Sequence, residues 1–110
     1  MCQFKNWYAD EGGYVIQCVE CKHFQVSFGT TMLTLDELQF DILTKTALQK
    51  KELHISMPDP DCKCIILPTP SNSVHIILSE RELLHLHEMT QAVDVEIKTN
   101  CMLSLFSSQD

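Results

Sequence analysis

The same succession of short apolar runs, a turn, a helix-capping motif and a helical pattern occurs twice in this sequence. The first copy reads CKHFQVSFGTTMLTLDEL and the second reads CKCIILPTPSNSVHIILSEREL. Alternating apolar and polar residues favour strands, and a turn between two such runs favours a hairpin. We therefore interpret residues 21–50 and 64–93 as two repeated hairpin–helix units, a pattern that predicts an α+β fold with neighbouring antiparallel strands.

Each unit has a capping box at the predicted start of its helix, a Ser or Thr followed three residues later by Glu. These boxes are Thr34 with Glu37 and Ser79 with Glu82. The hydroxyl accepts a hydrogen bond from the third backbone N–H while the Glu side chain reaches back, which favours helix initiation. The predicted helices are residues 35–50 and residues 80–93.

The remaining segments predict further strands. Residues 4–19 are expected to form a hairpin, because two apolar runs flank a Gly-Gly turn. Residues 52–57 alternate, and the tail 95–106 is apolar enough to form a last strand. We expect a single α+β domain over residues 1–110, with a mostly antiparallel sheet of five to seven strands and two helices packed on one face.

The charge of the chain argues against nucleic acid and anionic membranes as partners. The formal net charge is −7, and there is no basic cluster beyond Lys50-Lys51. Binding to phosphate groups needs a basic face. The first residues, MCQFKNWYADEGG, show neither a basic leader nor an apolar core of a signal peptide. We therefore predict a cytoplasmic protein with reduced thiols.

Two cysteine pairs are the candidate metal site. A C-x2-C pair between two predicted strands aims two thiolates at one point, and a C-x-C pair on a strand presents both side chains on one face. Four thiolates favour zinc, so zinc is the one cofactor that we predict; the alternatives are inert thiols without a cofactor and a redox or disulfide pair. The predicted ligands are Cys18, Cys21, Cys62 and Cys64, with His23 and His54 in reserve.

Other residues give weaker signals. His85 and His87 lie two positions apart on a predicted helix, so they cannot share a metal, and we expect His85 to face solvent. Trp7 and Tyr8 belong to an aromatic-rich first half of the chain. They predict either an aromatic end of the core or a homodimer or partner surface. The sequence has no phosphate-binding glycine loop and no nucleophile elbow.

Residues 15–43, VIQCVECKHFQVSFGTTMLTLDELQFDIL, resemble a family of small bacterial proteins of unknown function from Bacteroidetes. The resemblance rests on Cys18, Cys21, His23, the Phe-Gly-Thr turn and the LTLDEL helix start. It implies a bacterial cytoplasmic protein and supplies no catalytic residues.

Together these patterns predict a small non-enzymatic structural or interaction protein, with a homodimer or another protein as its partner. The alternative is a thiol-redox protein, a small-ligand-binding protein or an enzyme that uses the cysteine pairs.

Overall fold

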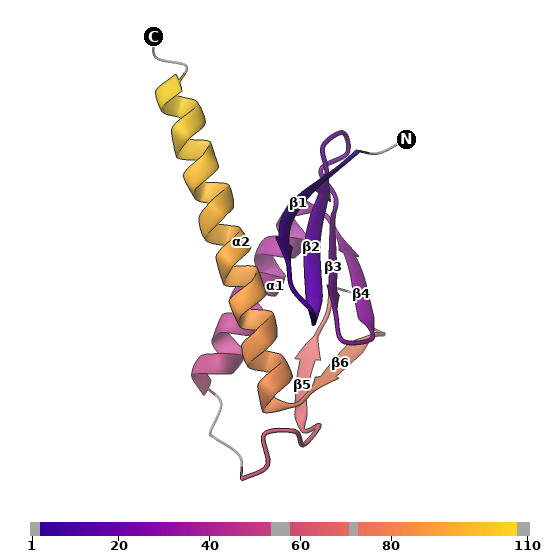
Figure 1. Cartoon of the computed structure of the whole chain (residues 1–110). Helices are drawn as coiled ribbons and strands as arrows, with labels where there is room; N and C mark the ends of the chain where they lie inside the picture. The colour runs from indigo at the N-terminus through magenta and orange to yellow at the C-terminus, as the bar shows by residue number, and fades with distance from the viewer. Residues whose placement is uncertain (1–2, 54–57, 71–72, 108–110) are drawn as a thin grey trace.

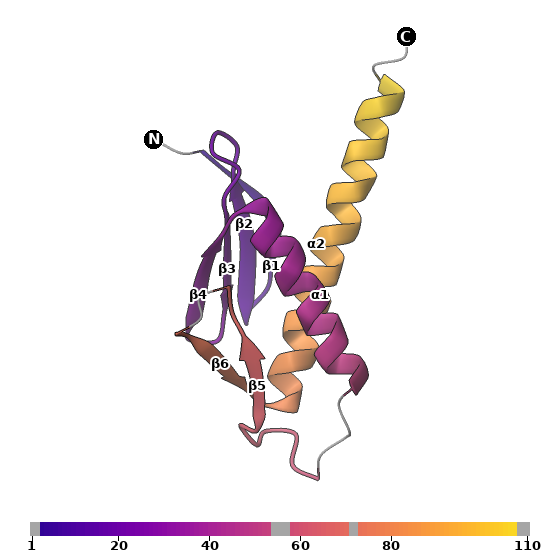
Figure 2. The same ribbon diagram turned by 180° about the vertical axis from the view of Figure 1, so that it is seen from behind.

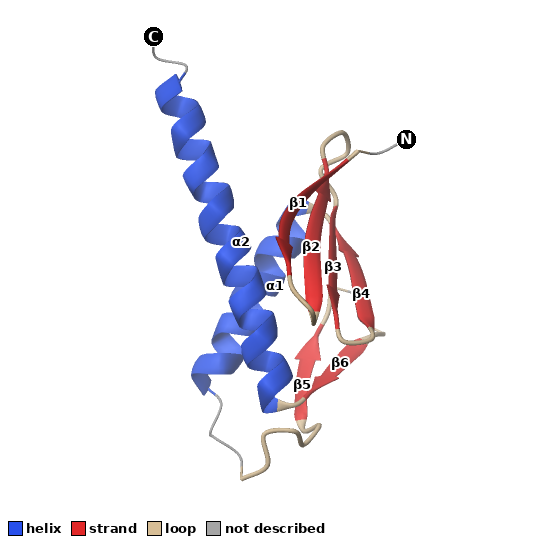
Figure 3. Cartoon of the chain, in the orientation of Figure 1, coloured by secondary structure: helices blue, strands red, loops and turns tan. Residues whose placement is uncertain are grey.

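The structure, a computed structural model, describes residues 3–53, 58–70 and 73–107. The chain folds as α+β, with strands and helices arranged as Figures 1 and 3 show. In chain order the elements are β1 (Phe4–Ala9), β2 (Gly13–Cys18), β3 (Phe24–Phe28), β4 (Thr31–Leu35), α1 (Glu37–Leu53), β5 (Ile65–Pro68), β6 (His75–Leu78) and α2 (Glu80–Ser107).

The first four strands form one antiparallel sheet in the order β1-β2-β3-β4. Val15, Val26 and Leu33 lie opposite one another across β2, β3 and β4, so they share one face. Val15 and Val26 are fully buried, while the intervening residues of these strands are less buried. The alternation seen in the sequence therefore marks the face of the sheet that carries the core.

Both helices lie on this face of the sheet, as predicted (Figures 1 and 2). The Phe40 ring of α1 stacks on the Phe24 ring of β3, with centroids 4.3 Å apart. Leu43 of α1 and Leu86 of α2 are buried in the same core cluster as the sheet residues. The two helices run in opposite directions, α1 away from the end of the sheet at which the N-terminus lies and α2 back toward it (Figure 2).

The predicted sheet of five to seven strands is wrong in its strand count. The main sheet has four strands, and β5 and β6 form a separate two-stranded sheet. Each of these strands has only four residues, and Leu67 and Leu78 point into the core while Ile66 and Ile77 are exposed. The short hairpin therefore packs by one face onto the core instead of extending the edge of the main sheet.

The predicted last strand, residues 95–106, is helical instead. It continues α2, which has 28 residues in place of the predicted 80–93. No Gly or Pro occurs between residues 80 and 107, so no backbone signal ends the helix. α1 likewise runs to Leu53, so the first residues of the predicted strand 52–57 are helical, and residues 54–57 lie outside the described residues.

One of the two capping boxes is confirmed and the other is displaced. The Glu82 N–H donates to Ser79 Oγ at 3.2 Å, and the Ser79 N–H donates to Glu82 Oε1 at 3.0 Å. In the first unit the cap is Asp36, whose Oδ1 accepts from the Gln39 N–H at 2.7 Å. Thr34 stays in β4, because strand pairing continues through Leu35 and moves the helix start by two residues.

Candidate functional site

Cys18 and Cys21 lie where β2 turns into β3. Cys18 ends β2 and is 1% exposed, while Cys21 is exposed. The Cys21 N–H points at Cys18 Sγ, 3.5 Å away, and the Cys18 N–H donates to the His23 carbonyl. Lys22 adopts a left-handed φ of 68° to close this turn. Cys18 is thus a buried thiol at the end of a central strand of the sheet.

Cys62 and Cys64 lie in the segment that leads into β5, and both side chains are exposed. Desolvation raises the pKa of the Cys64 thiol, and a hydrogen bond with the Cys62 side chain raises it further. A reactive cysteine needs a lowered pKa, because the thiolate is the nucleophile. This environment therefore works against a redox or catalytic role for Cys64.

The structure does not bring the two cysteine pairs together. Cys18 ends β2 near the N-terminus, whereas the segment before β5 lies at the opposite end of the sheet (Figure 1). The six residues of β2 alone span roughly 20 Å. Within residues 3–53, 58–70 and 73–107, no three His, Cys, Asp or Glu side chains are grouped to hold a metal ion. The reserve ligand His54 lies outside the described residues.

The physical reason is the direction of the two hairpin–helix units. In each unit the segment before the hairpin and the start of the helix lie at the same end, because the second strand returns the chain. Since α1 and α2 run in opposite directions, these equivalent ends lie far apart (Figure 2). A single zinc ion shared by the four predicted cysteines within one chain therefore does not fit this arrangement.

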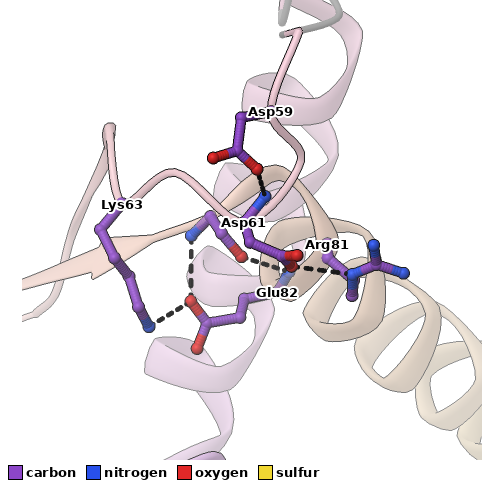
Figure 4. A network of polar contacts seen from close by, with 6 residues as sticks. Asp59, Asp61, Lys63, Arg81 and Glu82 are labelled. Carbon is purple, nitrogen blue, oxygen red and sulfur yellow. Dashed lines mark hydrogen bonds and ion pairs between the residues drawn. The ribbon is translucent and has the colours of Figure 1, made fainter.

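A polar network fixes the segment before β5 to the start of α2 (Figure 4). Arg81 Nε donates to Asp61 Oδ1 at 2.9 Å, and Lys63 forms an ion pair with Glu82. Partial burial by itself would raise the pKa of Glu82, but hydrogen bonds from Lys63 and Ser79 outweigh it and lower this pKa. The network is a structural clamp, since its charged groups are paired with one another.

We expected His85 to face solvent, but its side chain packs against the first turn of the chain instead. Its Nε2 lies 2.8 Å from Asp10 Oδ2, in the turn between β1 and β2. Tyr8 Oη donates to the same carboxylate oxygen at 2.7 Å, and the Gly12 and Gly13 N–H groups donate to Asp10 Oδ1 at 2.8 Å. Periodicity along α2 could not reveal this contact, because it joins residues 75 positions apart.

The pKa values of the two side chains in this cluster follow from these bonds. The bonds from His85 and Tyr8 hold the pKa of Asp10 far below its usual range. The bond to Asp10, together with desolvation, raises the pKa of Tyr8 to about 12. Both oxygens of Asp10 are occupied, so the cluster anchors the first turn to α2 instead of presenting a general base.

Trp7 and Tyr8 are half-buried and pack against the core cluster. The pairing of β1 with β2 shifts by one residue between Asn6 and Tyr8, and this bulge allows both rings to reach the helix side of the sheet. Trp7 Nε1 donates to Gln17 Oε1 at 3.0 Å, and Lys5 Nζ lies 4.0 Å from the Trp7 ring centroid. This position agrees with the aromatic core end that the sequence allowed as an alternative.

A run of exposed apolar side chains lies where the sequence predicted a strand. The second half of α2 extends beyond the sheet and α1 (Figure 1). Val95, Met102 and Phe106 on this projecting end, which we define as residues 95–107, are 54%, 57% and 66% exposed. The missing helix breaker after residue 93 was the one sequence signal that could have revealed it.

A shallow groove of about 540 Å³ lies beside the first half of α2, and we call it the α2 groove. His87 on its wall has a lowered pKa because of desolvation, and its Nδ1 is buried without a hydrogen-bond partner in the described part of the chain. Val95, the first residue of the projecting end, also lines the groove. Its lining residues are Lys51, Leu84, His87, Glu88, Gln91, Ala92 and Val95.

The comparisons with known proteins add no relative. No family model matches the chain, and neither the curated proteins nor the solved structures yield a match. The resemblance of residues 15–43 to the bacterial family therefore stays a prediction. Among the helices of the described residues, none combines the length and apolarity that crossing a membrane requires.

Proposed function

We propose that this chain is a non-enzymatic interaction protein and that α2 is the element that binds its partner. The observation that carries this proposal is the projecting end of α2, with Val95, Met102 and Phe106 all more than half exposed. A contiguous patch of exposed apolar side chains often marks a protein-binding surface. The acidic chain and its expected cytoplasmic location make a protein the partner class that we favour.

The energetics of the projecting end support the same conclusion. Tertiary packing of one face supplies most of the stability of helices in proteins, so a helical stretch without such packing is marginal in water. The residues beyond Ile97, the last helical side chain packed against the core cluster, have little of that packing within the chain. A partner that covers the apolar side chains would supply it.

The alternative, a thiol-redox protein or an enzyme, has less support. The raised pKa of Cys64 opposes thiolate chemistry, and the Asp10 cluster uses its polar groups internally. A hollow of about 350 Å³ between the sheet and the helices carries Lys22, Glu37, Asp41 and Asp94, but opposite charges there suggest no single class of ligand. The apolar end of α2 is the more specific feature.

Site-specific photocrosslinking in cells tests this function. A photoreactive phenylalanine analogue in place of Phe106, which is 66% exposed on the projecting end, should give a discrete crosslinked species. The control position is Lys45 on α1, whose side chain is 75% exposed and lies on the body of the protein. A specific adduct from position 106 and none from position 45 supports the proposal. The absence of an adduct from position 106 would contradict it.

A further inference from the structure

We propose that the partner of α2 is a second copy of this chain, paired as an antiparallel, two-fold symmetric helix pair. This inference rests on the proposed function and names its partner. Each chain has both halves of the interface, since the projecting end supplies apolar side chains and the α2 groove lies next to it on the same helix. In an antiparallel pair, the projecting end of one chain occupies the groove of the other.

The exposed stripe on α2 has the spacing of a helix-pairing seam. Its residues succeed one another at alternating intervals of four and three, which keeps them on one face of the helix. Leu84 and Met102, at its two ends, are 43% and 57% exposed, and the seam between them spans about 27 Å. The stripe consists of Leu84, Glu88, Gln91, Val95, Lys98 and Met102.

The order of residues along this stripe is complementary to itself when it is reversed. With the two-fold axis at the level of residue 93, Leu84 faces Met102 of the second copy and Glu88 faces its Lys98. Gln91 faces Val95 at the centre. A two-fold axis repeats every pair, so the seam has two apolar pairs at its ends and two pairs of opposite charge inside them.

Charge decides between this arrangement and the parallel one. A parallel, in-register pair would put Glu88 against Glu88 and Lys98 against Lys98, and like charges across a seam are destabilising. Lys98 already bonds Asp94 of its own chain at 2.9 Å and is 72% exposed, so its ammonium group has donors left for a carboxylate from the second copy. The antiparallel pairing satisfies both charges of the stripe.

The same arrangement would cover the apolar side chains of the α2 groove. The side chains of Val95 and Met102 from the second copy would cover Leu84 and the ring of His87, whose desolvation already lowers its pKa. Lys51 of α1 borders the groove and would flank the incoming helix. The interface would therefore join α1 and α2 of one chain to α2 of the other, a helical layer opposite the sheet.

Sedimentation equilibrium of charge-swapped variants tests the register. The full chain should form a dimer in the micromolar to millimolar range. Glu88→Lys and Lys98→Glu should each weaken dimerisation on the order of tenfold or more, because each creates two like-charge contacts. The double variant, and an equimolar mixture of the two single variants, should both recover dimers, since either combination restores opposite charges.

A matched control excludes a general effect of charge. Lys45→Glu removes an exposed i,i+4 ion pair with Asp41 on α1, as Lys98→Glu does with Asp94, and should leave the dimer unchanged. Met102→Glu should shift the protein to monomer while its circular dichroism stays that of the folded chain. Dimers whose strength does not respond to Glu88→Lys or Lys98→Glu would overturn the antiparallel register.

The outcome of crosslinking at position 106 separates this inference from the function on which it rests. A wild-type chain that stays monomeric at every concentration would overturn the second copy as partner. If the crosslinked species then contains a different protein, the interaction role of α2 still stands. If no crosslinked species forms, both proposals fail. A crosslinked species of two copies of the chain, lost in Met102→Glu, is the expected result.

Discussion

Asp10 connects two parts of the chain that lie 75 positions apart in the sequence. Its carboxylate accepts hydrogen bonds from the turn that joins β1 to β2 and from Tyr8, and it contacts the His85 ring on α2. Gly12 leaves room for this contact, because a Cβ there would lie 2.7 Å from His85 Cε1 and the ring would have to shift. The turn, β1 and α2 therefore depend on one side chain whose charge can be removed by a single substitution.

The ionisation of Tyr8 should report this contact directly. In a Tyr14→Phe background, tyrosinate absorbance should appear with a midpoint near pH 12, and Asp10→Asn should move the midpoint toward about 10. The control Asp41→Asn should not move it. Because the native phenol keeps its proton while the unfolded one loses it, the stability from this bond should be complete below pH 10 and lost toward pH 12. An unchanged midpoint in Asp10→Asn would show that the bond does not form.

Thiol accessibility is a second property set residue by residue. Under native conditions, alkylation mapped by mass spectrometry should modify Cys21, Cys62 and Cys64 early and Cys18 late, because Cys18 is the buried one of these four. In urea all four should react alike. Added zinc should not protect Cys18 and Cys62 together, because they lie at opposite ends of the sheet. If zinc protected Cys18 and Cys62 together from alkylation in a monomeric chain, the predicted four-cysteine zinc site would be supported.

At the scale of elements, the two helices begin differently although their sequences look alike. α2 begins at the predicted box, whereas in the first unit β4 extends through Leu35 and leaves the cap to Asp36. Strand pairing with β3 thus competes with helix capping for the same residues. Strand pairing prevails here, because every residue of β4, including Thr34, has an antiparallel partner on β3.

Alanine substitutions at the caps should separate the two cases. Ser79→Ala and Asp36→Ala should each lower the free energy of unfolding by about 1 kcal/mol, since each removes an acceptor for an N–H of the first helical turn. Thr34→Ala should change it by less than about 0.5 kcal/mol, because Thr34 is exposed in β4. Urea unfolding measures all three. A larger loss of unfolding free energy for Thr34→Ala than for Asp36→Ala would show that Thr34 is the cap, as the sequence predicted.

At the scale of the whole molecule, one core joins the sheet, the small hairpin and both helices. Leu86 lies fully buried within it, whereas Leu38 is exposed on α1. Around this core the chain is elongated, with extents of 55 × 29 × 27 Å and a radius of gyration of 15.2 Å. A compact chain of this length would have a radius of about 13 Å, and the projecting end of α2 accounts for much of the difference.

Unfolding of the core should be cooperative. Leu86→Ala should cost about 2–5 kcal/mol, because it removes buried methyl groups and leaves a cavity, and Leu38→Ala should cost less than about 0.5 kcal/mol. The fluorescence of the single tryptophan, Trp7, and far-ultraviolet circular dichroism should give the same transition. Two separate transitions would contradict the single domain that we predict.

Local patterns in the sequence were enough to predict the elements that local interactions stabilise. The alternation of Val15, Val26 and their neighbours marked the strands, and Ser79 with Glu82 marked the start of α2. The Gly-Gly turn marked the first hairpin. These features depend on residues close together in the chain, so their energetics can be read from sequence spacing.

The tertiary structure alone decided how these elements are oriented and where they end. The opposite directions of α1 and α2 separate Cys18 from Cys62, and the contact of His85 with Asp10 crosses most of the chain. The tail 95–106 has the composition of a strand but no strand edge pairs with it, so it continues α2. Each of these outcomes depends on contacts between segments that are distant in the sequence. The free energy of such a contact depends on which surfaces the rest of the folded chain leaves exposed, and sequence spacing does not reveal this.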